Sequence, residues 1–243
     1  PHRAPARVSE GVARRRGRGR PLGGCGTLYV VGTPIGNLGD ITLRAIETLR
    51  SVQRIAAEDT RRTRALLTHL SITGKPLTAL EAHASREVVE RLVDRLVDGE
   101  NVAYVTDAGM PAVSDPGSAL VRSAAARGVR VEVVPGPSAV TSAVALSGLV
   151  DAPFWFAGFL PRRGKARAET LSRIESCPDP VVVFEAPARI VATLAELAQR
   201  APERSAAVCR ELTKLHEEVV RGTLSEVASA DREGRAEITL VIG

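Results

Sequence analysis

The chain has 243 residues, enough for one large domain or two of moderate size with an ample buried core. Its composition is 44% hydrophobic and 25% charged, as in ordinary globular proteins, and the lack of any run of about 18 apolar residues excludes a membrane span. Aromatic residues make up only 3%, which excludes base stacking as the main mode of binding, and the net charge is +5.

The positive charge is concentrated in residues 1–26, which contain seven arginines and a single acidic residue, so the rest of the chain is nearly neutral. This segment is rich in arginine, glycine and proline without apolar periodicity, which predicts a disordered basic tail. Such a tail is either an electrostatic arm for RNA or a solvated extension, and the second is the more usual state of a run of like charges. No apolar stretch follows the arginines, so the segment does not resemble a secretory signal.

From residue 27 onward, short β-branched runs alternate with longer stretches whose apolar spacing is typical of helices. In the first half, the predicted strands are residues 28–31, 54–57, 102–105 and 129–134. The predicted helices are residues 42–52, 87–97, 118–126 and 139–146. Because these strands are apolar on both faces and alternate with helices, the pattern predicts a parallel sheet built from βαβ units.

A break in the pattern near residues 148–153 divides the chain into two predicted α/β domains, residues 27–149 and 150–243. In the second half, the predicted strands are residues 154–157, 181–184, 206–210, 218–221 and 237–242. The predicted helices are residues 166–174, 188–199 and 225–228. The last strands lie close together around one short helix, which predicts a more antiparallel, mixed second sheet.

Residues 106–117 form a loop after the predicted strand 102–105, and this loop is longer than a βα connection needs. Ligands bind at the carboxyl ends of parallel strands, where Asp107 can accept hydrogen bonds and glycine lets the backbone approach closely. Ser114 or Asp115 can instead serve as the cap of the next helix. The loop is therefore the strongest candidate for a ligand site.

Two further junctions between strands and helices contain glycine and proline. Residues 135–139 form a rigid Pro-Gly-Pro-Ser-Ala turn, in which Ser138 is a plausible N-cap. Residues 32–40 are glycine-rich, and we expect Asp40 to cap the helix that follows. Neither the dinucleotide fingerprint nor the P-loop pattern occurs in the chain, and no G-x-S-x-G elbow indicates a hydrolase.

Charged clusters follow three other predicted strands, at residues 58–62, 185–187 and 210–218. Each cluster alone is more often a helix cap or a solvated face than a catalytic set, but their shared position after strands favours function. No metal site is expected, because the histidines are not spaced as metal ligands are and the cysteines are scattered along the chain. Scattered cysteines also suit a reducing cytoplasm. The histidines are His2, His69, His83 and His216, and the cysteines are Cys25, Cys177 and Cys209.

Seven motifs occur in order along the chain. They are VGTPIGNLGD (31–40), AEDTR (57–61), DAG (107–109), SDPG (114–117), PGPS (135–138), GFLP (158–161) and RELTK (210–214). Together they resemble the ribosomal RNA small subunit methyltransferase I family, a branch of the tetrapyrrole methylase superfamily, from residue 27 to residue 243. The resemblance implies a two-domain α/β homodimer with a mostly parallel N-terminal sheet and a mixed C-terminal sheet, which binds S-adenosylmethionine between its domains.

By the same resemblance, the expected reaction is methylation of the ribose 2′-hydroxyl of a cytidine in the decoding region of 16S rRNA, as free RNA or in the small ribosomal subunit. The residues implied for the cofactor are Pro34, Asp107, Ala108, Gly109, Met110, Pro111, Ser138, Ala139, Leu160, Glu185 and Leu212. The arginines that we expect to contact RNA are Arg61, Arg62, Arg162, Arg163 and Arg189.

A ribose hydroxyl is a poor nucleophile at neutral pH, so a base within hydrogen-bond reach would help the reaction. The candidate catalytic residues are Glu58, Asp59, Glu211 and Lys214. Lys214 would have to be neutral to act as a base, whereas as a cation it would stabilise the developing alkoxide. A structural ion pair between Lys214 and Glu211 is the alternative.

The chain departs from the family pattern at two places. Residue 188 is alanine where the family carries histidine, so any role of that imidazole is absent or supplied elsewhere. Many relatives continue into a small helical domain beyond the final strand, whereas the sequence ends at Gly243. If that domain grips RNA, we expect the arginine tail or the dimer surface to substitute for it.

Two other functions compete with rRNA methylation. A methyltransferase of the same fold acting on a tetrapyrrole precursor would need an open trough for the carboxylates of the macrocycle. A non-catalytic RNA-binding module would depend on the arginine tail and would not need S-adenosylmethionine. The dense loops at the strand ends argue against the RNA-binding module. An assay with rRNA and with a tetrapyrrole precursor distinguishes the tetrapyrrole methyltransferase from the rRNA methyltransferase.

Overall fold

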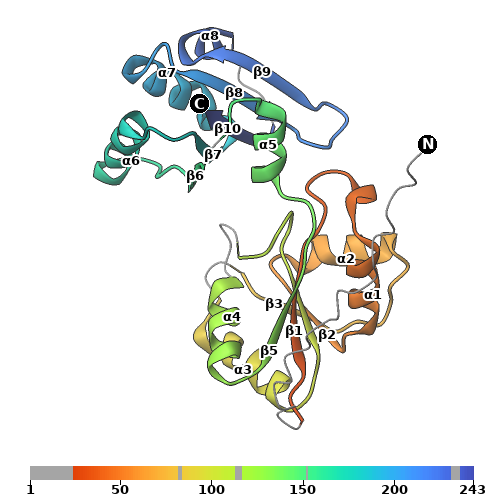
Figure 1. The fold of residues 1–243 in the computed structure, drawn as a ribbon. Helices are drawn as coiled ribbons and strands as arrows, with labels where there is room; N and C mark the ends of the chain where they lie inside the picture. The colour runs from red at the N-terminus through yellow and green to blue at the C-terminus, as the bar shows by residue number, and fades with distance from the viewer. Residues whose placement is uncertain (1–23, 82–83, 113–116, 152, 231–235) are drawn as a thin grey trace, which may run out of the picture.

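Two sheets, each of five strands, form the framework of the chain (Figure 1). The computed structural model describes residues 24–81, 84–112, 117–151, 153–230 and 236–243. Most of the predicted basic tail and the predicted caps Ser114 and Asp115 lie outside these residues. No helix within the described ranges is long and apolar enough to cross a membrane.

The first sheet has the strand order β3-β2-β4-β1-β5, and every neighbouring pair is parallel. Its strands are β1 (Thr27–Val31), β2 (Arg54–Ala57), β3 (Leu77–Ala79), β4 (Val102–Val105) and β5 (Arg130–Val134). The predicted parallel sheet is therefore confirmed, and β3 is an additional strand at its edge. Because all five strands run the same way, their carboxyl ends meet at one edge of the sheet.

Helices cover both faces of the first sheet, as Figure 1 shows. On one side lie α1 (Leu43–Ser51) and α2 (Thr60–His69), and on the other α3 (Arg86–Val97) and α4 (Gly117–Ala126). The alternation of side chains along β4 explains the two layers: Tyr104 packs with α3 and α4, whereas Ala103 packs with α1 and α2.

Two local predictions differ from the structure at the helix starts. The side chain of Thr42 accepts the capping hydrogen bond of α1, from the backbone N–H of Ala45, while Asp40 ends a short 3-10 helix, η1 (Leu38–Asp40). The prediction that Asp40 caps this helix was wrong. Helix α2 was not predicted, because its ten residues contain three arginines and few apolar side chains. The carboxylate of Asp59 supplies its cap by accepting from Arg61 N–H at 2.8 Å.

The second sheet has the order β6-β7-β10-β8-β9, with one parallel pair, β6 and β7, and antiparallel pairing elsewhere. Its strands are β6 (Trp155–Phe159), β7 (Val181–Glu185), β8 (Ser205–Arg210), β9 (Glu218–Thr223) and β10 (Ile238–Ile242). The predicted mixed sheet is confirmed. Because β10 runs opposite to its neighbours β7 and β8, its amino end lies beside their carboxyl ends.

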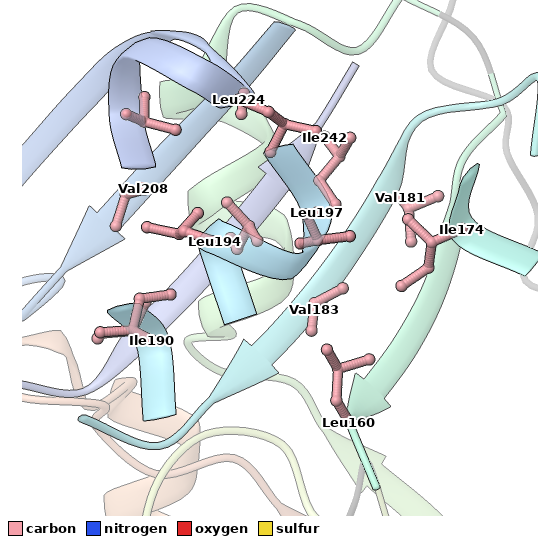
Figure 2. Packing of buried hydrophobic residues seen from close by; sticks show 14 of the residues in the cluster. Leu160, Ile174, Val181, Val183, Ile190, Leu194, Leu197, Val208, Leu224 and Ile242 are labelled. Carbon is pink, nitrogen blue, oxygen red and sulfur yellow. The ribbon is translucent and has the colours of Figure 1, made fainter. Parts of the chain in front are cut away.

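One face of the second sheet packs on α6 (Lys165–Ser176), α7 (Ile190–Arg200) and α8 (Leu224–Ala230), and η2 (Pro187–Arg189) precedes α7. Figure 2 shows the side chains of Ile190, Leu194 and Leu197 from α7 gathered with Val183 and Val208 of the sheet. These side chains are almost wholly buried, so this cluster forms the core of the second half of the chain.

Helix α5 (Ala139–Ser147) packs on the opposite face of the second sheet, against β8, β9 and β10. Its residues Val140 and Ala143 share a buried cluster with Val241 of β10 and with Ile35, which follows β1. Although α5 precedes the sequence boundary placed at residue 149, its packing joins it to the second sheet. Ile35 and α5 therefore connect the two sheets where their strand ends face each other.

Candidate functional site

A cavity of about 420 Å³ lies where the two sheets meet, within the size range of about 300–1,000 Å³ typical of small-molecule sites. The first half of the chain contributes Ile35, Glu58, Arg62, Thr106, Asp107, Ala108, Gly109, Met110, Ser138, Ala139 and Val140. The second half contributes Phe159, Phe184, Glu185, Ala186, Pro187, Leu212, Glu237, Ile238 and Thr239. We call this space the interdomain cavity.

The loops after β1 and β4 are tied together at the floor of this cavity. Thr33 and Gly109 form a two-way backbone bridge, with N–H to O distances of 3.0 and 3.1 Å. Gly109 has φ +80°, and a Cβ there would lie 3.3 Å from Cγ2 of Ile35. Any other residue at position 109 is therefore strained and crowds the cavity, which explains why glycine stands at this point.

Asp107 is held by backbone groups and by an arginine at the edge of the interdomain cavity. Its Oδ1 accepts from the backbone N–H of Asp59 at 3.0 Å, and its Oδ2 lies 3.5 Å from Nε of Arg62. Its own N–H donates to Oε2 of Glu58 at 3.3 Å. The loops after β2 and β4 are thus fixed to each other, and Asp107 still has acceptor positions for a ligand, since a carboxylate offers about four.

Ser138 is the N-cap residue of α5, as predicted, but its side chain makes no capping hydrogen bond. Ser138 and Ala139 line the interdomain cavity, so the amino end of α5 borders it. The unsatisfied N–H groups and positive dipole at a helix start favour a negatively charged ligand group. This end of the cavity can therefore hold a carboxylate.

Glu185 is the one cavity residue whose carboxylate is completely buried, with a side chain that is 0% exposed. Both Arg189 and Arg167 form ion pairs with it. It also accepts from the hydroxyl of Thr193 at 2.7 Å and from the N–H of Ala186 at 2.8 Å. The charge is thus paired and hydrogen-bonded, as a buried carboxylate must be.

The two arginines of this network also fix the segment that follows β6. Arg189 donates to the carbonyl of Leu160, and Arg167 donates to the carbonyl of Pro161, both at 3.2 Å. Leu160 is buried in the core rather than lining the cavity. Glu185 therefore determines the shape of one cavity wall through the arginines that it holds.

Glu58 and Asp59, the adjacent candidates for a catalytic base, have different surroundings. Glu58 lines the interdomain cavity. Asp59 caps α2 and forms a salt bridge with Arg61, and the hydrogen bonds from Arg61 lower the pKa of Asp59 from 3.8 to about 2. Because a general base works best when its pKa is near the working pH, the environment disfavours Asp59 for this role.

We expect Asp59 to titrate near pH 2 in a carbon-13 NMR titration of the folded chain. The Arg61→Ala substitution should return its pKa toward 3.8, while Arg64→Ala on the same helix should leave it unchanged. Because the folded pKa is depressed, the stabilisation from Asp59 is complete above pH 3.8 and is lost as the pH falls toward 2. A midpoint near 3.8 in the parent chain would contradict this account.

Lys214 and Glu211 do not line the interdomain cavity; they form an ion-paired group with Glu237, which does. Nζ of Lys214 lies 3.1 Å from carboxylate oxygens of both Glu211 and Glu237. The N–H of Glu237 donates to Glu211 and is the main cause that lowers the pKa of Glu211. Partial burial lowers the pKa of Lys214, but hydrogen bonds to both carboxylates outweigh it, and the pKa is raised.

A lysine with a raised pKa is a cation at neutral pH, so the surroundings of Lys214 disfavour its action as a base. Stabilisation of negative charge and a structural ion pair remain the two roles compatible with this state. The turn that carries Lys214 also touches the loop after β1: a Cβ at Gly36 would lie 2.4 Å from Cγ of Lys214 and 2.9 Å from the carbonyl of Leu212. The RELTK motif therefore helps to hold the two halves of the chain together.

The structure brings most of the residues implied for the cofactor to the interdomain cavity. These are Asp107, Ala108, Gly109, Met110, Ser138, Ala139, Glu185 and Leu212. Three others lie elsewhere: Pro34 lines a neighbouring cavity, Leu160 is in the core, and Pro111 is not among the residues lining either cavity.

The arginines that we expected to contact RNA divide into two groups. Arg61, Arg62, Arg162 and Arg163 are exposed. Arg189 is bound to Glu185 and to the carbonyl of Leu160, and its side chain is only 25% exposed. Its geometry indicates a structural role, so the other four are the better candidates for a contact with phosphate.

Several cavity residues were not predicted. Glu237 directly precedes the last strand, and Ile238 and Thr239 begin it, whereas the sequence argument considered only residues that follow strands. Phe159 and Phe184 form an aromatic pair with ring centroids 5.4 Å apart. Phe159 is part of the GFLP motif and Phe184 directly precedes Glu185, and these positions were the available signal for them.

Two five-stranded sheets joined at a cavity between their strand ends define the chain as a two-domain α/β protein of the tetrapyrrole methylase type. The model of the family described as Tetrapyrrole (Corrin/Porphyrin) Methylases matches residues 27–228. Solved structures share this fold. Diphthine synthase aligns with a TM-score of 0.70 over 89% of this chain and 88% of its own, at 19% identity. Uroporphyrin-III C-methyl transferase from Thermus thermophilus, complexed with S-adenosylhomocysteine, aligns with a TM-score of 0.65 over 90% and 97%, at 23% identity.

Curated relatives are more similar in sequence. Proteins named ribosomal RNA small subunit methyltransferase I from Xylella fastidiosa strain Temecula1 and Thermotoga maritima are each 46% identical over 89% of this chain, covering 81% and 98% of their own lengths. The protein of that name from Bacillus subtilis is 42% identical over 89% of this chain and 75% of its own. The chain belongs to the ribosomal RNA small subunit methyltransferase I family.

Proposed function

We propose that this chain transfers a methyl group from S-adenosylmethionine to the ribose 2′-hydroxyl of a cytidine in the decoding region of 16S rRNA. The observation that carries the proposal is the agreement between relatives with 42–46% identity, which bear the rRNA methyltransferase name, and the interdomain cavity, which residues of this chain's own motifs line. The proposed site of action is the cytoplasm, with free 16S rRNA or the small ribosomal subunit as substrate.

The interdomain cavity suits S-adenosylmethionine in three respects. The amino end of α5 at Ser138 can accept its carboxylate, and Asp107 can accept hydrogen bonds from its amine. Phe159 and Phe184, with Leu212, offer an apolar wall for the adenine. The glycine at position 109 keeps the floor of the cavity open.

When bound, S-adenosylmethionine supplies an electrophilic methyl group, so the protein has to align the donor with the accepting hydroxyl. The loop after β4 and the start of α5 orient the donor in this account. Glu58 lines the cavity and accepts from the N–H of Asp107, and in this proposal it takes the proton from the ribose hydroxyl. Glu237, held by Lys214, borders the same cavity from the second sheet.

RNA would reach the site along the exposed arginines. Arg61 and Arg62 lie at the start of α2, where Arg62 lines the interdomain cavity, and Arg162 and Arg163 follow β6, whose last residue, Phe159, lines it from the other half of the chain. Contacts of arginine with phosphate give affinity that falls as the salt concentration rises. The homodimer that the family resemblance implies is part of the proposal.

The Asp107→Ala substitution should weaken binding of S-adenosylmethionine by about tenfold or more, because a hydrogen bond to a charged group contributes about 1.5–3 kcal/mol. Isothermal titration calorimetry measures the effect directly. Asp98→Ala, at an exposed helix end away from the cavity, is the matched control and should bind like the parent. Unchanged affinity in a folded Asp107→Ala variant would remove this residue from the cofactor site.

The function is tested with radiolabelled S-adenosylmethionine and three acceptors: small ribosomal subunits, free 16S rRNA and a tetrapyrrole precursor. Transfer to one of the two RNA substrates, mapped to the 2′-oxygen of a cytidine in the decoding region, supports the proposal. Transfer to the tetrapyrrole precursor alone would show that the chain is a tetrapyrrole methyltransferase and would contradict the proposal. Absence of transfer to every acceptor would contradict the enzymatic function.

A further inference from the structure

A second cavity of about 270 Å³ adjoins the interdomain cavity. The loop after β1 supplies Thr33, Pro34 and Leu38, and α2 supplies Arg62, Thr63, Ala65 and Leu66. Thr106 and Asp107 complete its lining, and these two residues together with Arg62 also line the interdomain cavity. The two cavities therefore adjoin at these three residues, which we call the partition.

We propose that the second cavity receives the nucleoside whose ribose hydroxyl accepts the methyl group. This inference rests on the proposed function and names the place where the substrate nucleotide is held. Enzymes that modify a base within RNA or DNA take the nucleotide out of the stack and hold its base between aromatic or apolar side chains, and we extend this arrangement to an enzyme that modifies the ribose. The second cavity has this character, because Pro34 and Leu38 contribute apolar surface from the loop, and Ala65 and Leu66 contribute it from α2.

The volume of the second cavity discriminates between possible occupants. At about 270 Å³ it lies below the range of about 300–1,000 Å³ found for drug-sized ligands. It therefore suits a ligand of the size of one nucleoside and is too small for a tetrapyrrole macrocycle. A chain of this fold that methylates RNA needs a small slot for one nucleotide, whereas a tetrapyrrole methylase needs a broad trough.

The charge around the second cavity also suits a nucleotide within an RNA strand. Arg61, Arg62 and Arg64 are exposed on α2, the helix that forms one wall. The side chain of Arg62 is 64% exposed and lies at the shared partition. Arginines in this position can bind the phosphates on either side of a nucleotide whose base enters the slot. In this arrangement the ribose of the bound nucleotide lies at the partition and faces the interdomain cavity.

The inference is tested by filling the second cavity without touching the interdomain cavity. Ala65→Phe fills it from α2, and Leu38→Trp fills it from the opposite wall; both positions are exposed, so the folded chain can accept the larger side chains. Overpacking of a binding slot should lower kcat/KM for methyl transfer to small ribosomal subunits by about tenfold or more in each variant. Affinity for S-adenosylmethionine, measured by calorimetry, should stay within about twofold of the parent.

A second readout does not depend on activity. Broadening of the NMR lines of cytidine 5′-monophosphate by the parent chain should be reduced in Ala65→Phe and Leu38→Trp. Ala125→Phe, the same enlargement at an exposed alanine of α4, is the matched control and should behave like the parent in every measurement.

The outcomes separate this inference from the proposed function. If the parent transfers methyl groups to RNA and both filled variants do so equally well, the assignment of the second cavity is wrong while the function stands. Equal line broadening of cytidine 5′-monophosphate in all four proteins also overturns it. If the parent methylates no RNA, the proposed function fails and the inference falls with it.

Discussion

Replacing Glu185 with alanine is expected to lower the free energy of unfolding by about 3–5 kcal/mol, the usual cost of removing one partner from a buried ion pair. The Glu185 side chain is 0% exposed, and its partner Arg167 is only 11% exposed. Without the carboxylate, the positive charges of Arg167 and Arg189 face each other in a poorly hydrated space. Chemical denaturation followed by circular dichroism measures the change.

The matched control is Glu196→Ala, which removes another carboxylate from the same arginine. Glu196 lies 3.1 Å from Arg167, but its side chain is 42% exposed, so its ion pair should contribute no more than about 1 kcal/mol. Similar losses in the two variants would refute the special role of Glu185. A selective loss in Glu185→Ala should be accompanied by weaker binding of S-adenosylmethionine, because the segment at Leu160 is anchored through Arg189.

The fold was largely predictable because most strands are short apolar runs bounded by glycine, proline or charge. The failures occurred where tertiary contacts replace local signals. Strand β3 has three residues, and its backbone is ordered by pairing with β2. Helix α2 has little apolar periodicity, and its packing rests on Thr63 and Leu67, two buried residues on a strongly basic helix.

The candidate site was predictable on one side of the interdomain cavity only. In the first sheet, a residue after a strand lies at the shared carboxyl edge, so Asp107 and Glu58 follow from chain order. In the second sheet, the antiparallel strand β10 brings its first residues to that edge, which no local pattern reveals. Of the two ion pairs of Lys214, the sequence suggested only the one with Glu211, because both residues belong to the RELTK motif. The partner in the other pair, Glu237, is distant in sequence.

The position of Glu58 separates it from the other candidate bases. It borders the interdomain cavity, whereas Asp59 caps α2 and has a pKa of about 2, and Lys214 is a cation bound by two carboxylates. The N–H of Asp107 fixes the Glu58 carboxylate at 3.3 Å, next to the partition between the two cavities. With the proposed occupants in place, this carboxylate lines the cavity of the methyl donor and is hydrogen-bonded to Asp107, a residue that also lines the cavity of the acceptor.

The Glu58→Gln substitution should therefore lower the rate of methyl transfer by about 100-fold or more, the range for loss of a general base. Glutamine keeps the size of the side chain and a carbonyl that accepts from Asp107, so affinity for S-adenosylmethionine should change little. Asp59→Asn is the matched control: asparagine caps a helix as well as aspartate does, and the rate should stay near that of the parent. Single-turnover kinetics with small ribosomal subunits and calorimetry with S-adenosylmethionine give the two quantities. A parent-like rate in Glu58→Gln would exclude it as the base, and an equal loss of rate and cofactor affinity would assign it to binding instead.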